Sequence, residues 1–212
     1  MRKLTKKIAA VVLSAVMVGG VFAGCSATKD NNETPEKKTS YKIGICQLVQ
    51  HTALDAATKG FEDKLNELGE ADGITFEFDY QNASNDSANC TTIANKFVSS
   101  NYDLIMAVAT PALQACTTAT AASQTPIVAT AVTHFGTALD IDMPADGATG
   151  INVTGTTDLA PLDKQAEQLA TLFPEAKKVG ILYCSAEANS KLQADEMTSI
   201  MSKMGLDVTS YT

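Results

Sequence analysis

The chain has 212 residues, of which 45% are hydrophobic, and its 16 basic and 24 acidic residues give a formal net charge of −8. This length is sufficient for one or two domains with a packed core, and the acidic balance argues against nucleic acid as a partner. Arg2 is the only arginine. An anionic ligand must therefore be held by lysines, hydroxyls, amides or helix N-termini, because no guanidinium group follows residue 2.

Residues 1–24 have the organisation of a secretory signal peptide. The basic stretch MRKLTKK is followed by the uncharged run IAAVVLSAVMVGGVFAG, which is short for a membrane span and contains a glycine pair. An uncleaved transmembrane helix is the less favoured alternative. Without the four basic residues of this segment, the mature chain has 12 basic and 24 acidic residues, a net charge of −12.

The apolar run ends at Cys25, in the stretch VFAGCSA. Ala23 and Gly24 directly before a cysteine resemble a bacterial lipobox, in which the signal is cut before the cysteine and the sulfur carries a diacylglycerol; Phe22 replaces the usual leucine. The resemblance implies a stable lipid tether, because two or more acyl chains hold a protein on a membrane. Residues 25–40 are then the lipidated cysteine and a polar linker that we predict to be disordered.

Strands and helices alternate strictly through the first lobe that we predict, residues 41–150. Apolar and β-branched runs predict strands at 41–48, 74–82, 103–109 and 126–132. Helical patterns lie between them. The first is expected to stop at Gly69, the second centres on residues 93–98, and the third is expected to begin at Thr110-Pro111 with Thr110 as its N-cap. This alternation predicts an α/β fold with a parallel sheet and helices on both faces.

The same alternation resumes in residues 151–212, which we interpret as a hinge strand and the start of a second α/β lobe. Strands are predicted at 150–155, 177–184 and 206–212, and helices at 159–173 and 189–204. Three strands and two helices are too few to cover a parallel sheet on both faces. We therefore expect the second lobe to be incomplete and the chain to be part of a longer protein.

Polar residues follow the predicted strands at their carboxyl ends, where open parallel sheets bind ligands. In the first lobe the candidate ligand-binding residues are Gln47, His51, Asp55, Gln81, Asn82, Thr110 and Thr133. Near and within the second lobe they are Thr156, Asp158, Glu187, Asn189 and Ser190. The sequence predicts that these side chains line a cleft between two lobes.

Several candidates also have an ordinary structural interpretation. Thr110 either caps its helix only, or caps it and contacts a ligand. Thr52 and Asp55 resemble a capping box, so Asp55 either serves its helix or receives a ligand ammonium. The remaining ambiguous candidates are typical of loops or helix starts: Gln81, Asn82, Asp158, Asn189 and Ser190.

His51 and His134 are the only histidines, and both follow predicted strands. Histidine with carboxylates is a common site for zinc or manganese, but these two residues lack the H-x-H or H-x₃-H spacing of a metal site. We predict no metal. His51 is expected to hydrogen-bond to a ligand or stack on it, whereas His134 is expected to be a solvated loop residue.

Nothing in the sequence indicates an enzyme or a bound cofactor. There is no G-x-S-x-G, no phosphate-binding glycine loop and no dinucleotide fingerprint. Four further cysteines, Cys46, Cys90, Cys116 and Cys184, are widely spaced and form no C-x-x-C pair. Three of them fall in apolar patterns and are expected to be buried free thiols. A disulfide between two of the four is the alternative that the sequence leaves undecided.

Four stretches taken together resemble the substrate-binding lipoproteins of ABC-type importers, in the group that includes receptors for tryptophan and related amino acids. They are KIGICQLVQHTALDAATKGF, ATPALQA, INVTGTTD and KKVGILYCSAEANS. The resemblance covers residues 41–212 and implies a type I periplasmic-binding-protein-like fold of two lobes. Many relatives have proline where this chain has Thr52 or Ala53, and Asn-Pro where it has Cys184-Ser185.

The resemblance also implies a function. The protein would be lipid-anchored on the outer face of the bacterial cytoplasmic membrane, would close its lobes on a small organic ligand by a hinge motion, and would deliver it to an ABC permease and ATPase. An amino acid, in this group an aromatic one, is the implied ligand. A lipoprotein that senses a ligand for a membrane signalling receptor is the alternative, and a metal receptor is a weaker one.

Overall fold

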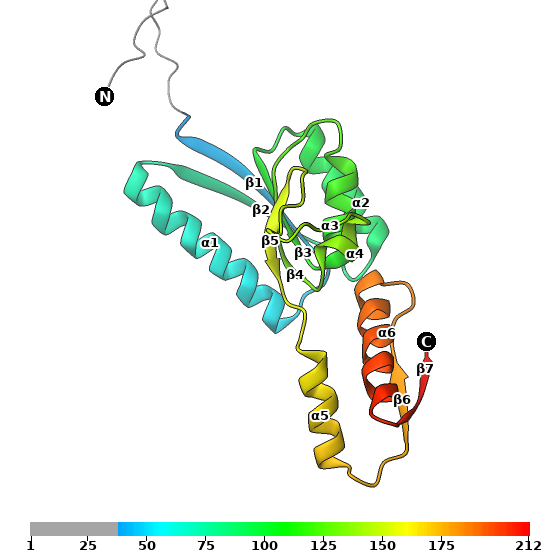
Figure 1. Ribbon diagram of the computed structural model, residues 1–212. Helices are drawn as coiled ribbons and strands as arrows, with labels where there is room; N and C mark the ends of the chain where they lie inside the picture. Colours follow the sequence, from blue (N-terminus) through cyan, green and yellow to red (C-terminus); the bar gives the residue numbers. More distant parts are fainter. Residues whose placement is uncertain (1–37) are drawn as a thin grey trace, which may run out of the picture. The chain divides into compact units, whose positions relative to one another are not determined.

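The computed structural model describes residues 38–212 (Figure 1). The predicted signal peptide, Cys25 and most of the predicted linker lie outside these residues. Within them, strands and helices alternate from β1 to β7, as the sequence predicts. None of the helices in this part of the chain combines the length and the apolar character that crossing a membrane requires.

Five parallel strands form the first sheet, in the order β2-β1-β3-β4-β5. Their bounds are β1 Ser40–Gln47, β2 Thr75–Asn82, β3 Leu104–Val108, β4 Ile127–Val132 and β5 Val153–Thr157. The first four strands confirm the prediction. The strand predicted near 150–155, which we interpret as a hinge strand, is β5; it hydrogen-bonds to β4 and extends the first sheet.

Gly155 explains why β5 approaches β4 so closely. A Cβ atom at this position would lie 2.0 Å from the carbonyl oxygen of Ala129, its register partner on β4. Only glycine leaves room for the backbone of the neighbouring strand at this distance. The glycine therefore fixes where the chain joins the edge of the first sheet.

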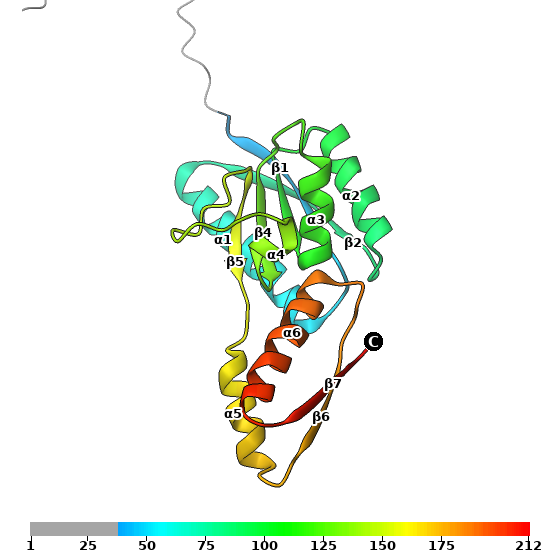
Figure 2. The same cartoon turned by 45° about the vertical axis from the view of Figure 1, so that its right-hand side comes forward.

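Helices cover both faces of this sheet (Figure 1). Their bounds are α1 Thr52–Asp72, α2 Ser87–Ser99, α3 Thr110–Ala119 and the short α4 Phe135–Leu139, which the sequence did not predict. On one face, α1 packs its apolar side chains against Ile43, Ile45 and Met106. On the other face, α2 and α3 lie side by side (Figure 2) and bury the larger core cluster, which includes Phe97 and Leu113.

The end of α1 differs from the prediction that Gly69 stops it. The helix continues past Gly69 to Asp72 and ends at Gly73, which has the left-handed φ of 67° that favours glycine. Gly69 is buried within the last turns because a Cβ there would lie 2.5 Å from the carbonyl oxygen of Ile74. Gly69 therefore allows the end of α1 to pack closely on β2 and does not stop the helix.

Three thiols, those of Cys46, Cys90 and Cys116, are buried in the core between the sheet and helices α2 and α3, as predicted. Hydrogen bonding with Cys116, together with burial, raises the pKa of Cys46, and hydrogen bonding with Cys46 together with burial raises the pKa of Cys90. Cys184 is exposed. The three buried cysteines are therefore core residues, and the raised pKa values of Cys46 and Cys90 keep those two thiols protonated.

The remaining elements form a second, smaller α/β unit. It contains α5 Leu162–Leu172, β6 Lys178–Leu182, α6 Ala188–Lys203 and β7 Asp207–Tyr211. The two strands are parallel and form a two-stranded sheet. Leu182 is 81% exposed and Tyr211 is 57% exposed, so these helices leave apolar side chains of the sheet uncovered.

Candidate functional site

The carboxyl ends of the first four strands meet at one edge of the five-stranded sheet. The register pairs Gln47 at the end of β1 with Asn82 on one side and with Val108 on the other. Val108 in turn pairs with Thr130 near the end of β4. The predicted first-lobe ligand residues lie at the last positions of these strands or in the loops and first helical turns that follow them, so the sheet brings them to a common edge.

Gln47 is a fully buried polar side chain at this edge. Its Oε1 accepts a hydrogen bond from Thr58 Oγ1 at 2.7 Å, and its Nε2 donates to the Asp55 carboxylate at 2.7 Å and to the Val49 carbonyl at 2.9 Å. The sequence prediction included Gln47 and Asp55 but missed Thr58. Thr58 lies one helical turn beyond Asp55, on the side of α1 that faces the sheet, and this spacing was the available signal.

The expected capping box at the start of α1 is wrong. The N-cap of α1 is His51, whose Nδ1 accepts from the backbone N–H of Ala53 at 3.2 Å. Asp55 accepts a hydrogen bond from Gln47. His134 also has a structural role that the prediction of a solvated loop residue missed, because its Nδ1 accepts from the backbone N–H of Thr137 at 3.1 Å and caps α4.

The N-terminus of α3 has no side-chain cap. The N-cap position belongs to Ala109, so the prediction that Thr110 caps this helix is wrong. Ala109 has φ 84° and ψ 157°, a strained conformation for a residue with a Cβ atom. Thr110 is only 2% exposed, and among residues 38–212 its buried Oγ1 has no hydrogen-bond partner. In the first turn Pro111 has no N–H and that of Leu113 donates to the carbonyl of Ala109, so the buried hydroxyl lies with the N–H groups of Thr110 and Ala112 at the end of β3.

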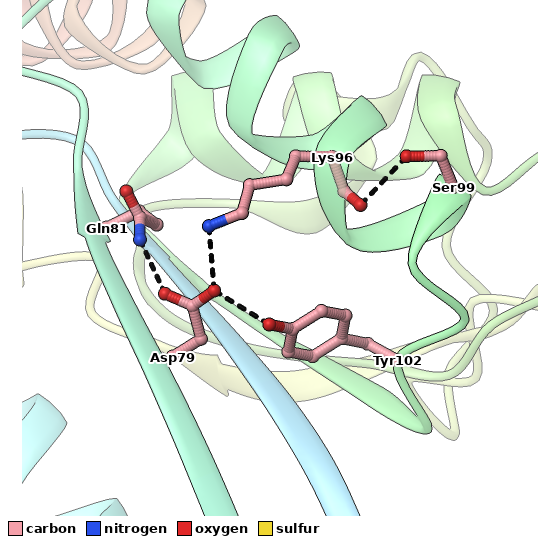
Figure 3. A network of polar contacts seen from close by, with 5 residues as sticks. All are labelled: Asp79, Gln81, Lys96, Ser99 and Tyr102. Atoms are coloured by element: carbon pink, nitrogen blue, oxygen red, sulfur yellow. Dashed lines mark hydrogen bonds and ion pairs between the residues drawn. The ribbon is translucent and has the colours of Figure 1, made fainter.

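Gln81 points into a polar network on the α2 side of the sheet (Figure 3). Its Nε2 donates to the Asp79 carboxylate, which also accepts from Lys96 Nζ at 2.8 Å and from Tyr102 OH at 2.7 Å. Burial opposes the charge of Asp79, but the three donors outweigh it and lower the pKa of Asp79 to about 2. The network joins β2 to α2 and to the start of β3, and no pattern in the sequence indicates it.

The other first-lobe candidates at this edge have turn and strand contacts. Asn82 accepts a hydrogen bond from the backbone N–H of Ser84 at 2.8 Å, which is turn chemistry. Thr133 is buried, and its carbonyl oxygen accepts from Thr157 Oγ1 at 2.6 Å. Thr156 Oγ1 lies 3.1 Å from Thr130 Oγ1. Thr133 and Thr156 therefore lie where β4 and β5 run side by side.

Asp158 follows β5, and its backbone N–H donates to the carbonyl of Val132 at 3.1 Å. It does not begin α5, as one interpretation predicted, because that helix starts at Leu162 with Pro161 at the N-cap position. The exposed carboxylate of Asp158 lies at the exit of the chain from the first sheet. This position keeps it among the candidate ligand residues.

The start of α6 carries the remaining candidates. Glu187 occupies the N-cap position without a side-chain capping bond. The next turn contains Asn189, whose Oδ1 is buried and has no hydrogen-bond partner in the described part of the chain, and Ser190, whose Oγ accepts from the N–H of Cys184 at 2.9 Å. Two uncapped helix starts, those of α3 and α6, thus each have a buried oxygen that residues 38–212 leave unpaired.

The described residues contain no group of three or more histidine, cysteine, aspartate or glutamate side chains arranged to hold a metal ion. Both histidines use Nδ1 to accept a capping hydrogen bond, so that atom is already engaged in the fold. The arrangement at the sheet edge therefore consists of hydroxyls, amides, helix N-termini and carboxylates. These groups bind small polar molecules by hydrogen bonds and charge.

Residues 42–212 match the model of a protein family described as ABC transporter substrate binding protein. A curated relative, the tyrosine-binding protein of Clostridioides difficile strain R20291, is 40% identical over an alignment 212 positions long, which covers 96% of this chain and 59% of the relative. The chain thus spans less than two thirds of the length of this relative.

Solved structures give the same picture. An ABC domain from Streptococcus pneumoniae in complex with L-Trp is 34% identical with a TM-score of 0.72, over 81% of this chain and 57% of that one. The ligand-free, open structure of a substrate binding protein with adhesive properties from Clostridium difficile is 41% identical with a TM-score of 0.60, over the same shares. The α/β, type I periplasmic-binding-protein-like fold is confirmed, and the second lobe is incomplete relative to these structures.

Proposed function

Since the chain belongs to the family of ABC transporter substrate binding proteins, we propose that it captures a free amino acid, an aromatic one first, and delivers it to an ABC permease and its ATPase. The proposal is supported by a tyrosine-binding relative and by a similar structure that holds L-Trp. The ligand would be enclosed between the first lobe and a complete second lobe. Release would follow from a hinge motion that opens the two lobes.

One observation carries this proposal: the start of α3 has no side-chain cap and has a buried, unpaired Thr110 hydroxyl within the described residues. A free amino acid always has a carboxylate, and the part of the site that lies in these 212 residues has no arginine to bind it. At α3 the first-turn N–H groups, the helix dipole and the buried Thr110 hydroxyl offer the alternative means of binding a carboxylate. The strained φ of Ala109 is the kind of backbone distortion that persists at binding sites because it aims such donors.

We also propose that the protein is a lipoprotein that acts outside the cytoplasm. The basic segment, the apolar run and Cys25 in VFAGCSA support export followed by lipid attachment. We propose binding without chemistry and without a cofactor. The burial and raised thiol pKa values of Cys46 and Cys90 support this, because only an accessible thiolate acts as a nucleophile.

Thr110 provides the test. In the full-length mature protein, Thr110→Val removes the hydroxyl at constant shape, and we expect the affinity for L-tyrosine or L-tryptophan to fall by about 1 to 3 kcal/mol. The free energy of unfolding without ligand should stay the same or rise, because the hydroxyl has no partner among residues 38–212. Calorimetric titration and urea unfolding measure the two quantities.

Thr117→Val is the matched control, since Thr117 lies in the same helix and its Oγ1 is also buried and unpaired within the described residues. It should leave ligand affinity unchanged because it is two turns from the helix start. An equal loss in both variants, or no loss in Thr110→Val, would contradict a carboxylate site at α3. Absence of binding to any free amino acid would contradict the proposed function itself.

A further inference from the structure

The amide of Gln47 has a fixed orientation. Nε2 donates both of its hydrogens, to Asp55 Oδ1 and to the Val49 carbonyl, while Oε1 accepts from Thr58 Oγ1. The flipped amide would place Oε1 against two acceptors, the carboxylate and the carbonyl. Because both donors are used within the protein and the side chain is fully buried, Gln47 has no donor left for a ligand.

Asp55 presents a carboxylate whose charge is not neutralised locally. It is half-buried and lies in the first turn of α1, where the helix dipole favours a negative charge. Within residues 38–212 no lysine or histidine nitrogen lies within 4.0 Å of it, and Lys59, one turn further along, pairs with Asp63 instead. Its Oδ1 accepts from Gln47, while Oδ2 has no hydrogen bond in this part of the chain.

The surroundings of Asp55 are acidic. Burial raises the pKa of Tyr80 on β2, and the nearby carboxylates of Asp55 and Glu62 raise it further. Both acids therefore lie close enough to act on the same hydroxyl. A cationic group that approached Asp55 would meet a carboxylate that no lysine or histidine of residues 38–212 pairs with, and an ammonium group is attracted to such a charge.

We propose that Gln47 is a positioning residue that holds the Asp55 carboxylate in place to receive the ammonium group of an amino acid ligand. Gln47 acts through Asp55 and does not touch the ligand. Thr58 fixes the amide of Gln47 from the other end by donating to Oε1. The hydrogen bonds that link Thr58, Gln47 and Asp55 thus form one continuous support for the carboxylate. The inference rests on the proposed function, since it concerns the same ligand.

The experiment compares an amino acid with the same molecule lacking its ammonium group. Full-length mature protein is titrated with L-tyrosine and with 3-(4-hydroxyphenyl)propanoate, and L-tryptophan with 3-indolepropanoate serves as the second pair. Gln47→Met removes the amide and keeps the chain length. We expect it to weaken binding of the amino acid about tenfold or more and that of the analogue less than about twofold, because only the amino acid uses Asp55.

Asn152→Met is the control for a general loss of stability. In the wild type, the side-chain amide of Asn152 also connects two segments, since it donates to Thr120 Oγ1 at 3.0 Å and to the Thr125 carbonyl at 2.6 Å. It contacts neither Asp55 nor α1. This variant should lower the unfolding temperature and leave the ratio of the two affinities as in the wild type. A changed ratio in Asn152→Met would show that selectivity follows stability, which would overturn the inference.

A double-mutant cycle tests whether Gln47 affects ligand binding through Asp55. In an Asp55→Asn background, Gln47→Met should weaken L-tyrosine binding less than about twofold further, because the carboxylate that it positions is already gone. If Gln47→Met does not fold, Thr58→Val, which removes only the contact to Oε1, should shift the same ratio in the same direction.

Besides a changed ratio in Asn152→Met, three outcomes overturn the inference. Additive losses in the cycle would show that Gln47 acts independently of Asp55. An unchanged ratio in Gln47→Met, or in Thr58→Val where that variant is the one that folds, would show that the support does not serve the ammonium. Failure of the wild type to bind any free amino acid would overturn both this inference and the proposed function, whereas the first two outcomes leave the proposed function intact.

Discussion

Asp79 shows how one side chain can join three parts of the first lobe. It lies on β2 and accepts hydrogen bonds from Gln81 on the same strand, from Lys96 on α2 and from Tyr102 before β3 (Figure 3). These donors lower the pKa of Asp79 from 3.8 to about 2 although burial opposes the charge, and the hydrogen bond to Asp79 raises the pKa of Tyr102 to about 12. Both shifts describe a charged carboxylate that the fold requires.

Asp79→Asn should therefore lower the free energy of unfolding at pH 7 by about 1 to 3 kcal/mol, since hydrogen bonds to a charged group are lost. The folded pKa is below the unfolded value, so the charge stabilises the fold above pH 3.8 and this contribution is lost as the pH falls toward 2. The difference between wild type and variant should shrink over that interval. Urea unfolding at several pH values measures it.

Asp195→Asn is the control for this experiment, because Asp195 pairs with Lys191 on the exposed surface of α6. Exposed pairs contribute little, so the expected change is below about 0.5 kcal/mol. A loss in Asp79→Asn that stays constant from pH 7 to pH 2 would show that shape rather than charge is responsible.

At the scale of single elements, the sequence predicts the central strands to within a residue or two because parallel strands buried on both faces are continuous apolar runs. It also predicts that the candidate polar residues share one edge of the sheet, since all parallel strands end there. Helix ends are predicted less well. Gly69 resembles a stop and Thr110 resembles a cap, but packing on Ile74 and the turn at Ala109 decide their roles, and neither partner is visible from local spacing.

The pairing of β5 with β4 offers a test at this scale. Gly155→Ala should lower the free energy of unfolding by about 1 to 3 kcal/mol, because the new methyl group overlaps the backbone of Ala129. Gly180→Ala is the matched strand glycine, and its Cβ would meet only the ring of Tyr211 at 3.3 Å. This control should change stability by less than about 0.5 kcal/mol. Equal effects in urea unfolding would argue against the close approach of β5.

For the molecule as a whole, strict alternation of strands and helices was enough to predict an α/β fold, whereas the boundary between two lobes stays a prediction. The residues of β5 do not show which sheet this strand joins, because only its hydrogen bonds to β4 decide that. The support of Asp55 by Gln47 was equally hidden. A glutamine at a strand end looks like a ligand residue until the helix that packs over it supplies partners.

Membrane attachment is the prediction that belongs to the whole protein. Labelling of the expressed protein with a radioactive fatty acid should depend on Cys25, and globomycin should block its processing. Cys25→Ala should abolish labelling and release the protein from membranes, since no acyl chain remains to hold it. Cys184→Ala, which removes an exposed thiol elsewhere, should label as the wild type does. Undiminished labelling of Cys25→Ala would refute lipid attachment at that residue.

The buried thiols have a consequence for how a protein at the proposed location reaches its folded state. Cys46, Cys90 and Cys116 come from β1, α2 and α3, and they are shielded only once these three elements have packed. Before that, each is open to the oxidants found outside the cytoplasm, and any disulfide between two of them would trap a misfolded chain. Folding of the first lobe thus competes with oxidation, and the short sequence distances between neighbouring strands and helices favour folding.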